Sequence, residues 1–325
     1  MTRIGFHASH EQISPRQLLA DVQHAEQAGF QMAMCSDHLV PWSARQGHSG
    51  YTWAWLGAAL ATTSLRLGCV SAPGQRYHPA VHAQKIATLA QMFPGRFWVA
   101  LGSGEAMNEH VTGDRWPSKE ERTRRLEECV DVVRRLLGGE EVSHDGLVRV
   151  DRARVWDLPD EPPPLVGPAA SVESAARVAA WADGLVTFNR PVEVLRDLVA
   201  AYRDAGGRGP LALQVHLSWA PTEDEAVRIA TDQWRTNVFG GTVPWDVDTP
   251  AAFDALAEHV GVDSVRRAVR ISAEPAQHVE WLEEYAALGF DEIYLHHVGQ
   301  EQAGFLDTFG EKVLPAVATR AGGAS

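Results

Sequence analysis

An aspartate and a histidine stand next to each other in the polar run Ser36-Asp37-His38, which follows a predicted strand and precedes Trp42. A carboxylate beside an imidazole can orient the ring and tune its proton affinity, and a nearby indole can wall a site for a planar ligand. The alternative is a loop histidine that only satisfies local hydrogen bonds. We take His38 and Trp42 as the first candidates for acid–base chemistry and ligand contact.

A glycine-rich turn, Gly102-Ser103-Gly104, leads into a second polar group that includes Glu105 and Asn108. Glycines allow tight turns whose backbone N–H groups can cradle a phosphate or the edge of a ring. One Gly-x-Gly is also common in an ordinary connection between a strand and a helix. Glu105, directly behind the turn, is a candidate proton donor.

The segment 71–79 is a third candidate, because two prolines and a glycine must give this loop a defined shape. Arg76 within it could meet a carboxylate or a phosphate. A salt bridge that locks the loop, or a contact between subunits, would explain the same arginine.

Histidines at four predicted strand ends raise a metal site as an alternative; they are His7, His38, His216 and His296. Metal-dependent barrel hydrolases typically use two histidines one residue apart after the first strand. This chain has His7 and His10 there, a spacing that does not put both rings on one strand face. The sequence therefore predicts no metal ligands and keeps a metal-dependent barrel hydrolase only as an alternative.

The elements that must position these residues alternate between short β-rich runs and longer helical patterns, which is typical of parallel strands joined by helices. Eight strands are predicted, at Arg3–Ala8, Gln31–Ser36, Leu65–Ser71, Phe97–Leu101, Pro164–Gly167, Gly184–Phe188, Leu211–Ser218 and Glu292–His296. This number favours an α/β fold of the (β/α)8 TIM-barrel type, whose active site lies at the carboxyl ends of the strands.

Two segments interrupt the alternation. Residues 141–155 contain a hairpin turn at His144-Asp145-Gly146, and a longer excursion between Trp234 and Arg270 could form a lid. We expect one barrel domain over residues 1–320, with an insertion around 235–270 and a flexible tail at 321–325.

Composition excludes several classes of function. The chain is 45% hydrophobic and 22% charged, as in an ordinary globular protein, and its formal net charge of −13 disfavours nucleic acid and anionic membrane surfaces as partners. No apolar stretch is long enough to span a bilayer, and no leader precedes the first strand. Three cysteines form neither a disulfide framework nor a paired metal site, so we expect a cytoplasmic location.

Taken together, the motifs Ser36-Asp37-His38, Arg76-Tyr77-His78-Pro79-Ala80, Pro94-Gly95-Arg96-Phe97 and Gly102–Glu109 resemble the luciferase-like monooxygenase superfamily. Specifically, they look like the group that contains the glucose-6-phosphate dehydrogenases dependent on the deazaflavin coenzyme F420. Within that group, Phe6–Gln12, Asn237–Gly240 and Tyr294–His296 resemble a branch regarded as FMN-dependent.

This resemblance implies a tricyclic ring at the carboxyl end of the barrel. It implies cofactor contacts from Asp37, Cys69, Val70, Ala72, Ser103, Gly104, Asn108, Ala170 and Ser171, with a cis peptide bond at Cys69-Val70. His38, Trp42 and Glu105 would face the substrate. Thr187 and Arg190 match two of the substrate-binding positions, but the lysines that hold a phosphate in those dehydrogenases are missing here.

We therefore expect a flavin-dependent oxidoreductase that transfers hydride to or from a small organic substrate or oxygenates it, with FMN as cofactor and coenzyme F420 as the alternative. An F420-dependent glucose-6-phosphate dehydrogenase and a catalytically silent flavin-binding relative are further alternatives. The resemblance also implies a homodimer, and a flavin reductase is a possible partner.

Overall fold

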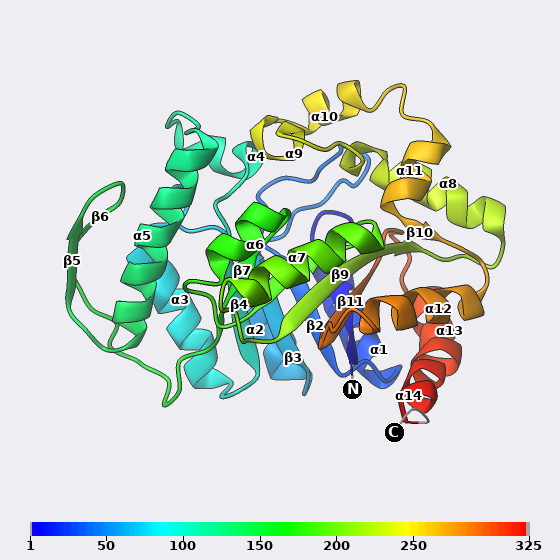
Figure 1. Ribbon diagram of the computed structural model, residues 1–325, viewed down its shortest axis with the longest axis horizontal. Coiled ribbons are helices and arrows are strands. Elements are labelled where there is room, and N and C mark those ends of the chain that lie inside the picture. Colours follow the sequence, from blue (N-terminus) through cyan, green and yellow to red (C-terminus); the bar gives the residue numbers. More distant parts are fainter. Residues whose placement is uncertain (1, 323–325) are drawn as a thin grey trace.

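The computed structural model describes residues 2–322, and its centre is a closed barrel of eight parallel strands (Figure 1). These strands are β1 (Arg3–Ala8), β2 (Met32–Ser36), β3 (Arg66–Ser71), β4 (Phe97–Leu101), β7 (Leu165–Pro168), β8 (Leu185–Phe188), β9 (Leu211–Ser218) and β11 (Glu292–His297). Each pairs in parallel with its neighbours, and pairing between β8 and β9 closes the ring. The predicted (β/α)8 class is confirmed, and no strand limit differs from its predicted position by more than one residue.

Helices surround the barrel. They are α1 (Pro15–Gln27), α2 (Thr52–Thr62), α3 (Pro79–Met92), α4 (Ala106–Glu109), α5 (Lys119–Leu137), α6 (Val172–Val178), α7 (Val192–Asp204), α8 (Glu223–Trp234), α12 (Pro275–Ala286), α13 (Ala303–Thr308) and α14 (Leu314–Gly322). Helix α1 shows why these limits arise: Pro15 has a backbone preset for a first helical turn, and Gly29 adopts a φ of 97° just after the end.

Side chains alternate along each strand between the barrel interior and the helical layer. An interior cluster contains Met34, Trp98, Ala212 and Tyr294. The intervening residues, such as Leu213, join the larger core between the strands and the helices. This alternation fixes which strand residues can reach a ligand at the carboxyl end of the barrel.

Both predicted interruptions are present. The first is an antiparallel hairpin of β5 (Val142–Asp145) and β6 (Arg149–Ala153), which projects from one side of the molecule (Figure 1). The second, between α8 and β10 (Arg270–Ile271), holds three short helices: α9 (Val243–Asp246), α10 (Pro250–Leu256) and α11 (Val262–Ala268).

The strand β10 escaped prediction because it has only two residues. It pairs with Leu217 and Ser218 of β9, whereas β8 pairs with the first half of the same strand. The eight-residue strand β9 therefore extends beyond the end of β8. Its second half has a free edge on that side, and the insertion rejoins the sheet there through β10.

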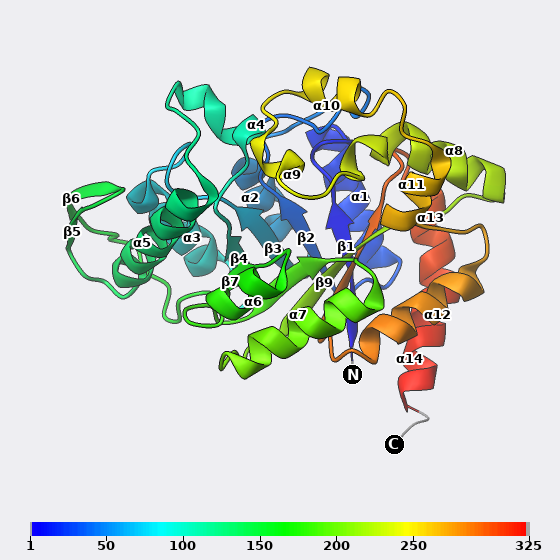
Figure 2. The ribbon, with the colours of Figure 1, turned by 45° about the horizontal axis from the view of Figure 1, so that its top comes forward.

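Helix α9 lies beside α4, and both α9 and α10 lie on the side of the molecule away from both termini (Figures 1 and 2). Of the predicted tail at 321–325, residues 321 and 322 belong to α14, and residues 323–325 lie outside the described part of the chain. No helix in residues 2–322 combines the length and apolar character that crossing a membrane requires.

The cis peptide bond predicted at Cys69-Val70 is wrong, because residues 2–322 contain no cis bond. Strand β3 instead keeps a regular register with β4 through this point, with Cys69 opposite Val99 and Val70 opposite Ala100. A trans bond is the ordinary state of a non-proline residue in a strand.

Candidate active site

Three side chains at the carboxyl end of the barrel form a row of alternating charge. His38, just after β2, lies with its Nδ1 2.5 Å from Glu11 Oε1 and its Nε2 3.5 Å from Glu105 Oε2. Ser9 donates a hydrogen bond of 2.7 Å to the other oxygen of Glu11. One imidazole is thus held between two carboxylates that come from the loops after β1 and β4.

The electrostatics of this row follow from the ion pairs. Burial alone would lower the pKa of His38, but the charges of Glu11 and Glu105 outweigh it and raise this pKa to about 9. Burial would likewise raise the pKa of Glu11, yet His38 lowers it to about 2. For Glu105, burial prevails and the pKa is raised. His38 is therefore an imidazolium at neutral pH, paired with an ionised Glu11.

Trp42 connects this row to the insertion. Its ring meets His38 edge to face at 5.4 Å between centroids, and meets Phe253 of α10 in the same way at 5.3 Å. Asp254 accepts hydrogen bonds from Ser43 Oγ at 2.6 Å and from the backbone N–H of Ala44 at 3.0 Å. Helix α10 thus fastens the loop that carries Trp42.

Asp37 does not share the orientation of His38. Its Oδ2 accepts hydrogen bonds from Trp53 Nε1 at 2.8 Å and Ser71 Oγ at 2.7 Å, and its Oδ1 accepts one from Tyr77 at 3.2 Å. The side chain is 1% exposed. The Asp37 carboxylate thus belongs to a buried network that ties α2 and the loop after β3 to the end of β2, and its contact with the cofactor stays a prediction.

Arg76 holds its own loop in place, which was the alternative to binding a carboxylate or phosphate of a ligand. Its guanidinium donates a 2.7 Å hydrogen bond to the carbonyl oxygen of Asp37, and its backbone N–H donates a 2.6 Å bond to Glu109 Oε2. Its side chain is only 9% exposed. The arginine therefore locks the loop 71–79 against the ends of β2 and α4.

Small, half-buried residues at the ends of β3, β4 and β7 fit a planar ring. They include Val70, Ala72, Ser103, Gly104 and Ala170. The ends of the three strands meet here: a Cβ added to Gly102 would be in ordinary van der Waals contact with the ring of Pro168 at 3.5 Å and the carbonyl oxygen of Ser71 at 3.8 Å. Larger side chains here would fill the space that a tricyclic cofactor needs, so these predicted residues suit a ring-binding role.

Four other predicted ligand residues point or bond elsewhere. Strand alternation places Cys69 and Thr187 on the helix side, away from the interior residues Val70 and Val186. Asn108 is 3% exposed: its Oδ1 accepts from the N–H of Leu39 and its Nδ2 donates to Glu105. Ser171 caps the first turn of α6. Of these, Asn108 still serves the site, because it orients Glu105.

Arg190 follows β8 and lies 5.4 Å from the centroid of the Phe188 ring, a residue that faces the barrel interior. It is half-buried. Of the two predicted substrate-binding residues, Thr187 points to the helix side, whereas Arg190 lies near the carboxyl end of the barrel.

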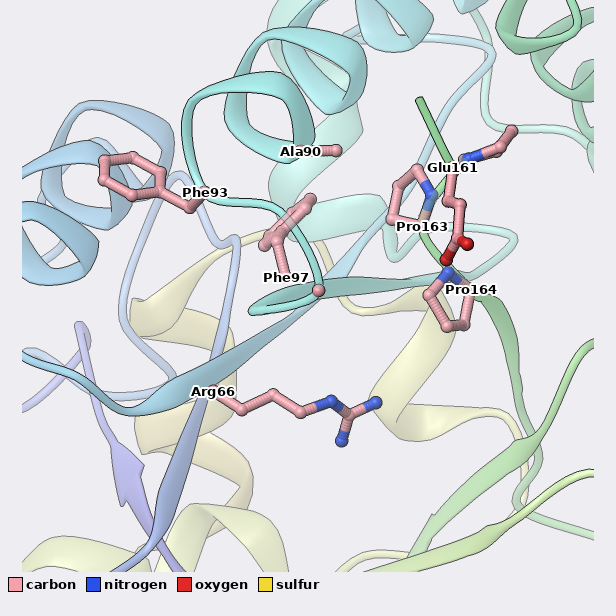
Figure 3. A pocket seen from close by; sticks show the side chains of 9 residues that line it. Arg66, Ala90, Phe93, Phe97, Glu161, Pro163 and Pro164 are labelled. Carbon is pink, nitrogen blue, oxygen red and sulfur yellow. The ribbon is translucent and has the colours of Figure 1, made fainter. Parts of the chain in front are cut away.

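The cavity in Figure 3 lies at the opposite, amino end of the barrel. Arg66 and Phe97, the first residues of β3 and β4, line it together with Pro163 and Pro164, which come directly before β7. In parallel barrels this end contributes to stability rather than to chemistry. We do not assign the cavity to the reaction.

Glu11 is the site residue that the sequence did not reveal. The adjacency of Asp37 and His38 suggested that Asp37 orients the imidazole, whereas Glu11 does so from the loop after β1. The available signal was its position: it follows a strand end, as the other candidates do. Within residues 2–322 there is no group of three or more His, Cys, Asp or Glu side chains that could hold a metal ion.

A closed parallel barrel with acid–base groups at the carboxyl ends of its strands defines a (β/α)8 enzyme. The family model of the luciferase-like monooxygenases matches residues 1–292, and the chain belongs to this family. The predicted family and the oxidoreductase class are confirmed.

Two curated relatives are similar over nearly the full chain. An F420-dependent glucose-6-phosphate dehydrogenase of Beutenbergia cavernae is 36% identical and is covered to 98%, as is this chain. An F420-dependent hydroxymycolic acid dehydrogenase of Mycobacterium tuberculosis is 33% identical over 96% of this chain and 87% of its own.

Among solved structures, an F420-dependent secondary alcohol dehydrogenase in complex with an F420-acetone adduct superposes with a TM-score of 0.90 at 30% identity, covering 97% of this chain and 99% of its own. A Baeyer–Villiger monooxygenase component in complex with FMN is only 17% identical, with a TM-score of 0.70, and shares the fold alone.

Proposed function

We propose that this protein is a dehydrogenase that uses coenzyme F420 to oxidise an alcohol or to reduce the corresponding carbonyl compound. The observation that carries the proposal is the imidazole of His38 held between Glu11 and Glu105, which can accept a proton when neutral and return it when charged. Alcohol oxidation needs one group to receive the hydroxyl proton and another to receive the hydride. The chain supplies the first, and the cofactor, when bound, accepts the hydride.

In the oxidation direction, neutral His38 takes the hydroxyl proton while the C–H bond breaks and its electron pair leaves with the hydrogen. Glu11 fixes the ring through Nδ1 and stabilises the imidazolium that forms, so that Nε2 is the atom that faces substrate. In the reduction direction, the imidazolium returns the proton to the carbonyl oxygen. Trp42 contacts the His38 ring edge to face, and the His38 side chain is only 15% exposed to water.

The choice of F420 over FMN rests on the relatives. The similar proteins of at least 30% identity named above are F420-dependent, whereas the FMN-bound structure is distant. The expectation of FMN thus has less support than its alternative. A separate flavin reductase is also unnecessary in this scheme, because the alcohol itself supplies the hydride. A homodimer stays a prediction.

The test is a pair of titrations of purified protein with F420 and with FMN, followed by F420 reduction assays with a panel of alcohols. We expect micromolar or tighter binding of F420 and bleaching of its absorbance with at least one alcohol. Binding of FMN without measurable affinity for F420 would overturn the proposal.

A further inference from the structure

Four side chains form a polar layer on the inner face of the barrel at its carboxyl end: His7, Gln214, His216 and His296, hereafter the imidazole layer. They continue the interior rows of β1, β9 and β11, because Ala212 and Tyr294 of the same strands belong to the interior cluster. The acid–base scheme above uses none of the four.

The members of the layer are held by contacts with each other. The rings of His7 and His296 stack with centroids 4.3 Å apart. The amide nitrogen of Gln214 lies 3.2 Å from His216 Nε2 and 3.0 Å from His296 Nδ1, so it joins two strands. Gln12 Oε1 lies 2.8 Å from the other nitrogen of His296.

This layer retains unused hydrogen-bonding capacity. His7 is 3% exposed, yet neither of its ring nitrogens has a hydrogen-bond partner. A buried polar group without a partner is costly, which points to a partner that arrives with a ligand. Gln214 and His216 are half-buried, so a ligand can reach them.

Charge and shape restrict what that ligand can be. Burial lowers the pKa of His7 to about 4 and that of His216 to about 3, so both rings are neutral at pH 7. Aromatic rings flank the layer, with Phe188 at 6.1 Å and Trp234 at 4.8 Å from the His216 centroid. Neutral imidazoles and an amide can bind hydroxyl groups, and aromatic faces can cover C–H groups.

Two arginines at the end of the insertion, in α11 and β10, are paired with other residues. Arg266 pairs with Glu223 at 2.9 Å, and Arg270 Nε donates to the hydroxyl of Tyr285 at 2.7 Å. Arg190 lies against the Phe188 ring. Arg266 and Arg270 are therefore already paired and are not free to hold a phosphate beside the neutral layer.

The layer adjoins the acid–base row through Glu11, which pairs with His38 and whose charge also acts on His7. We infer that the substrate is a neutral diol or polyol: its reacting hydroxyl lies at His38, and a second hydroxyl binds the imidazole layer. This inference rests on the proposed function and specifies its substrate.

The test compares two alcohols that differ by a single hydroxyl, 2,3-butanediol and 2-butanol, and adds glucose against glucose 6-phosphate. With the F420-loaded enzyme we expect kcat/KM about tenfold higher for the diol than for 2-butanol, since one hydrogen bond to a buried neutral group gives up to roughly this factor. Glucose 6-phosphate should not exceed glucose. Tryptophan fluorescence titrations with 2,3-butanediol and with 2-butanol, with and without cofactor, measure the two Kd values. We expect the Kd for the diol to be lower.

Two variants test whether the imidazole layer causes the preference for the diol over 2-butanol. His216→Phe and Gln214→Met each remove hydrogen-bonding groups at similar volume and should bring the diol-to-monool ratio close to one through KM. His144→Phe, a histidine change in the distant β5–β6 hairpin, is the matched control and should keep the ratio.

The outcomes separate the inference from the proposed function. An equal preference for both butanol derivatives, a ratio unchanged by both variants, or faster turnover of glucose 6-phosphate would overturn the inference while leaving an F420-dependent dehydrogenase. Absence of F420 binding and reduction would overturn the proposed function, whereas the fluorescence preference for the diol would still be measurable.

Discussion

At the scale of single residues, neighbours in the sequence proved poor guides to neighbours in space. Asp37 and His38 are adjacent, but Asp37 turns into the buried network with Trp53 and Ser71, and His38 turns to Glu11. Consecutive side chains at a strand end point in opposite directions. The structure thus brings the predicted His38 and Glu105 together, but the carboxylate that pairs with Nδ1 of the imidazole is Glu11 and not Asp37.

Replacing Glu11 tests the origin of the raised pKa of His38. Because the Glu11 charge raises this pKa to about 9, Glu11→Gln should lower it. Oxidation by the wild type should rise with pH up to about 9, as His38 becomes neutral. In the variant the midpoint should move to lower pH by at least ~1 unit, measured as kcat/KM against pH.

The exposed Glu141→Gln is the control and should leave the midpoint in place. An unchanged profile in Glu11→Gln would show that His38 does not set the pH dependence. A melting curve of Glu11→Gln, recorded in parallel, checks that the variant is folded.

Asp37→Asn tests the buried network. The carboxylate accepts hydrogen bonds from Trp53, Ser71 and Tyr77, so an amide nitrogen in place of either oxygen would face a donor. We expect a loss of ~1–3 kcal/mol in the free energy of unfolding, measured by denaturant titration. The exposed Asp114→Asn should change it little. Normal stability with weakened cofactor binding would instead support direct contact of Asp37 with the ring.

At the scale of elements, the sequence predicted all eight barrel strands, because β-rich runs alternate with amphipathic helical patterns throughout. The hairpin at 141–155 was predicted too. What the sequence did not show was the internal order of the insertion, whose helices α9 to α11 are short and have at most seven residues each. Their positions depend on contacts with distant loops rather than on local periodicity.

Asp254→Ala tests whether helix α10 holds the loop that carries Trp42. The substitution removes two hydrogen bonds, to Ser43 Oγ and to the N–H of Ala44. We expect faster hydrogen exchange in residues 42–46 and in α10, and a KM raised about threefold or more, since each lost bond is worth ~0.5–1.5 kcal/mol. Asp248→Ala, an exposed position in the same insertion, is the matched control. Unchanged exchange in residues 42–46 would contradict this role for α10.

At the scale of the whole molecule, buried histidines set the response to acid. Burial lowers the pKa of His278 to about 4 and that of His297 to about 3, as it does for His7 and His216. A lowered folded pKa gives stability that is present above the unfolded value of 6.5 and is lost as the pH falls towards the folded value. The raised pKa of His38 stabilises the folded protein at low pH, but this is one histidine against the four named above, whose pKa values are lowered.

The protein should therefore lose stability on mild acidification. We expect Tm to fall by at least ~5 °C between pH 7 and pH 5, measured by calorimetry at constant ionic strength. Equal Tm values at the two pH values would mean that these histidines are hydrated or paired in solution.

The way in which the insertion rejoins the sheet restricts how this segment can move. The segment leaves the barrel from α8 and returns at β10, whose residues are hydrogen-bonded to the second half of β9. Both of its ends are thus anchored in the rigid frame, and the segment cannot swing outward as an arm on one hinge. A movement of this segment would therefore involve its middle, around α9 and α10, rather than a swing about one end. The length of chain between the two anchors then limits how far α9 can move away from α4.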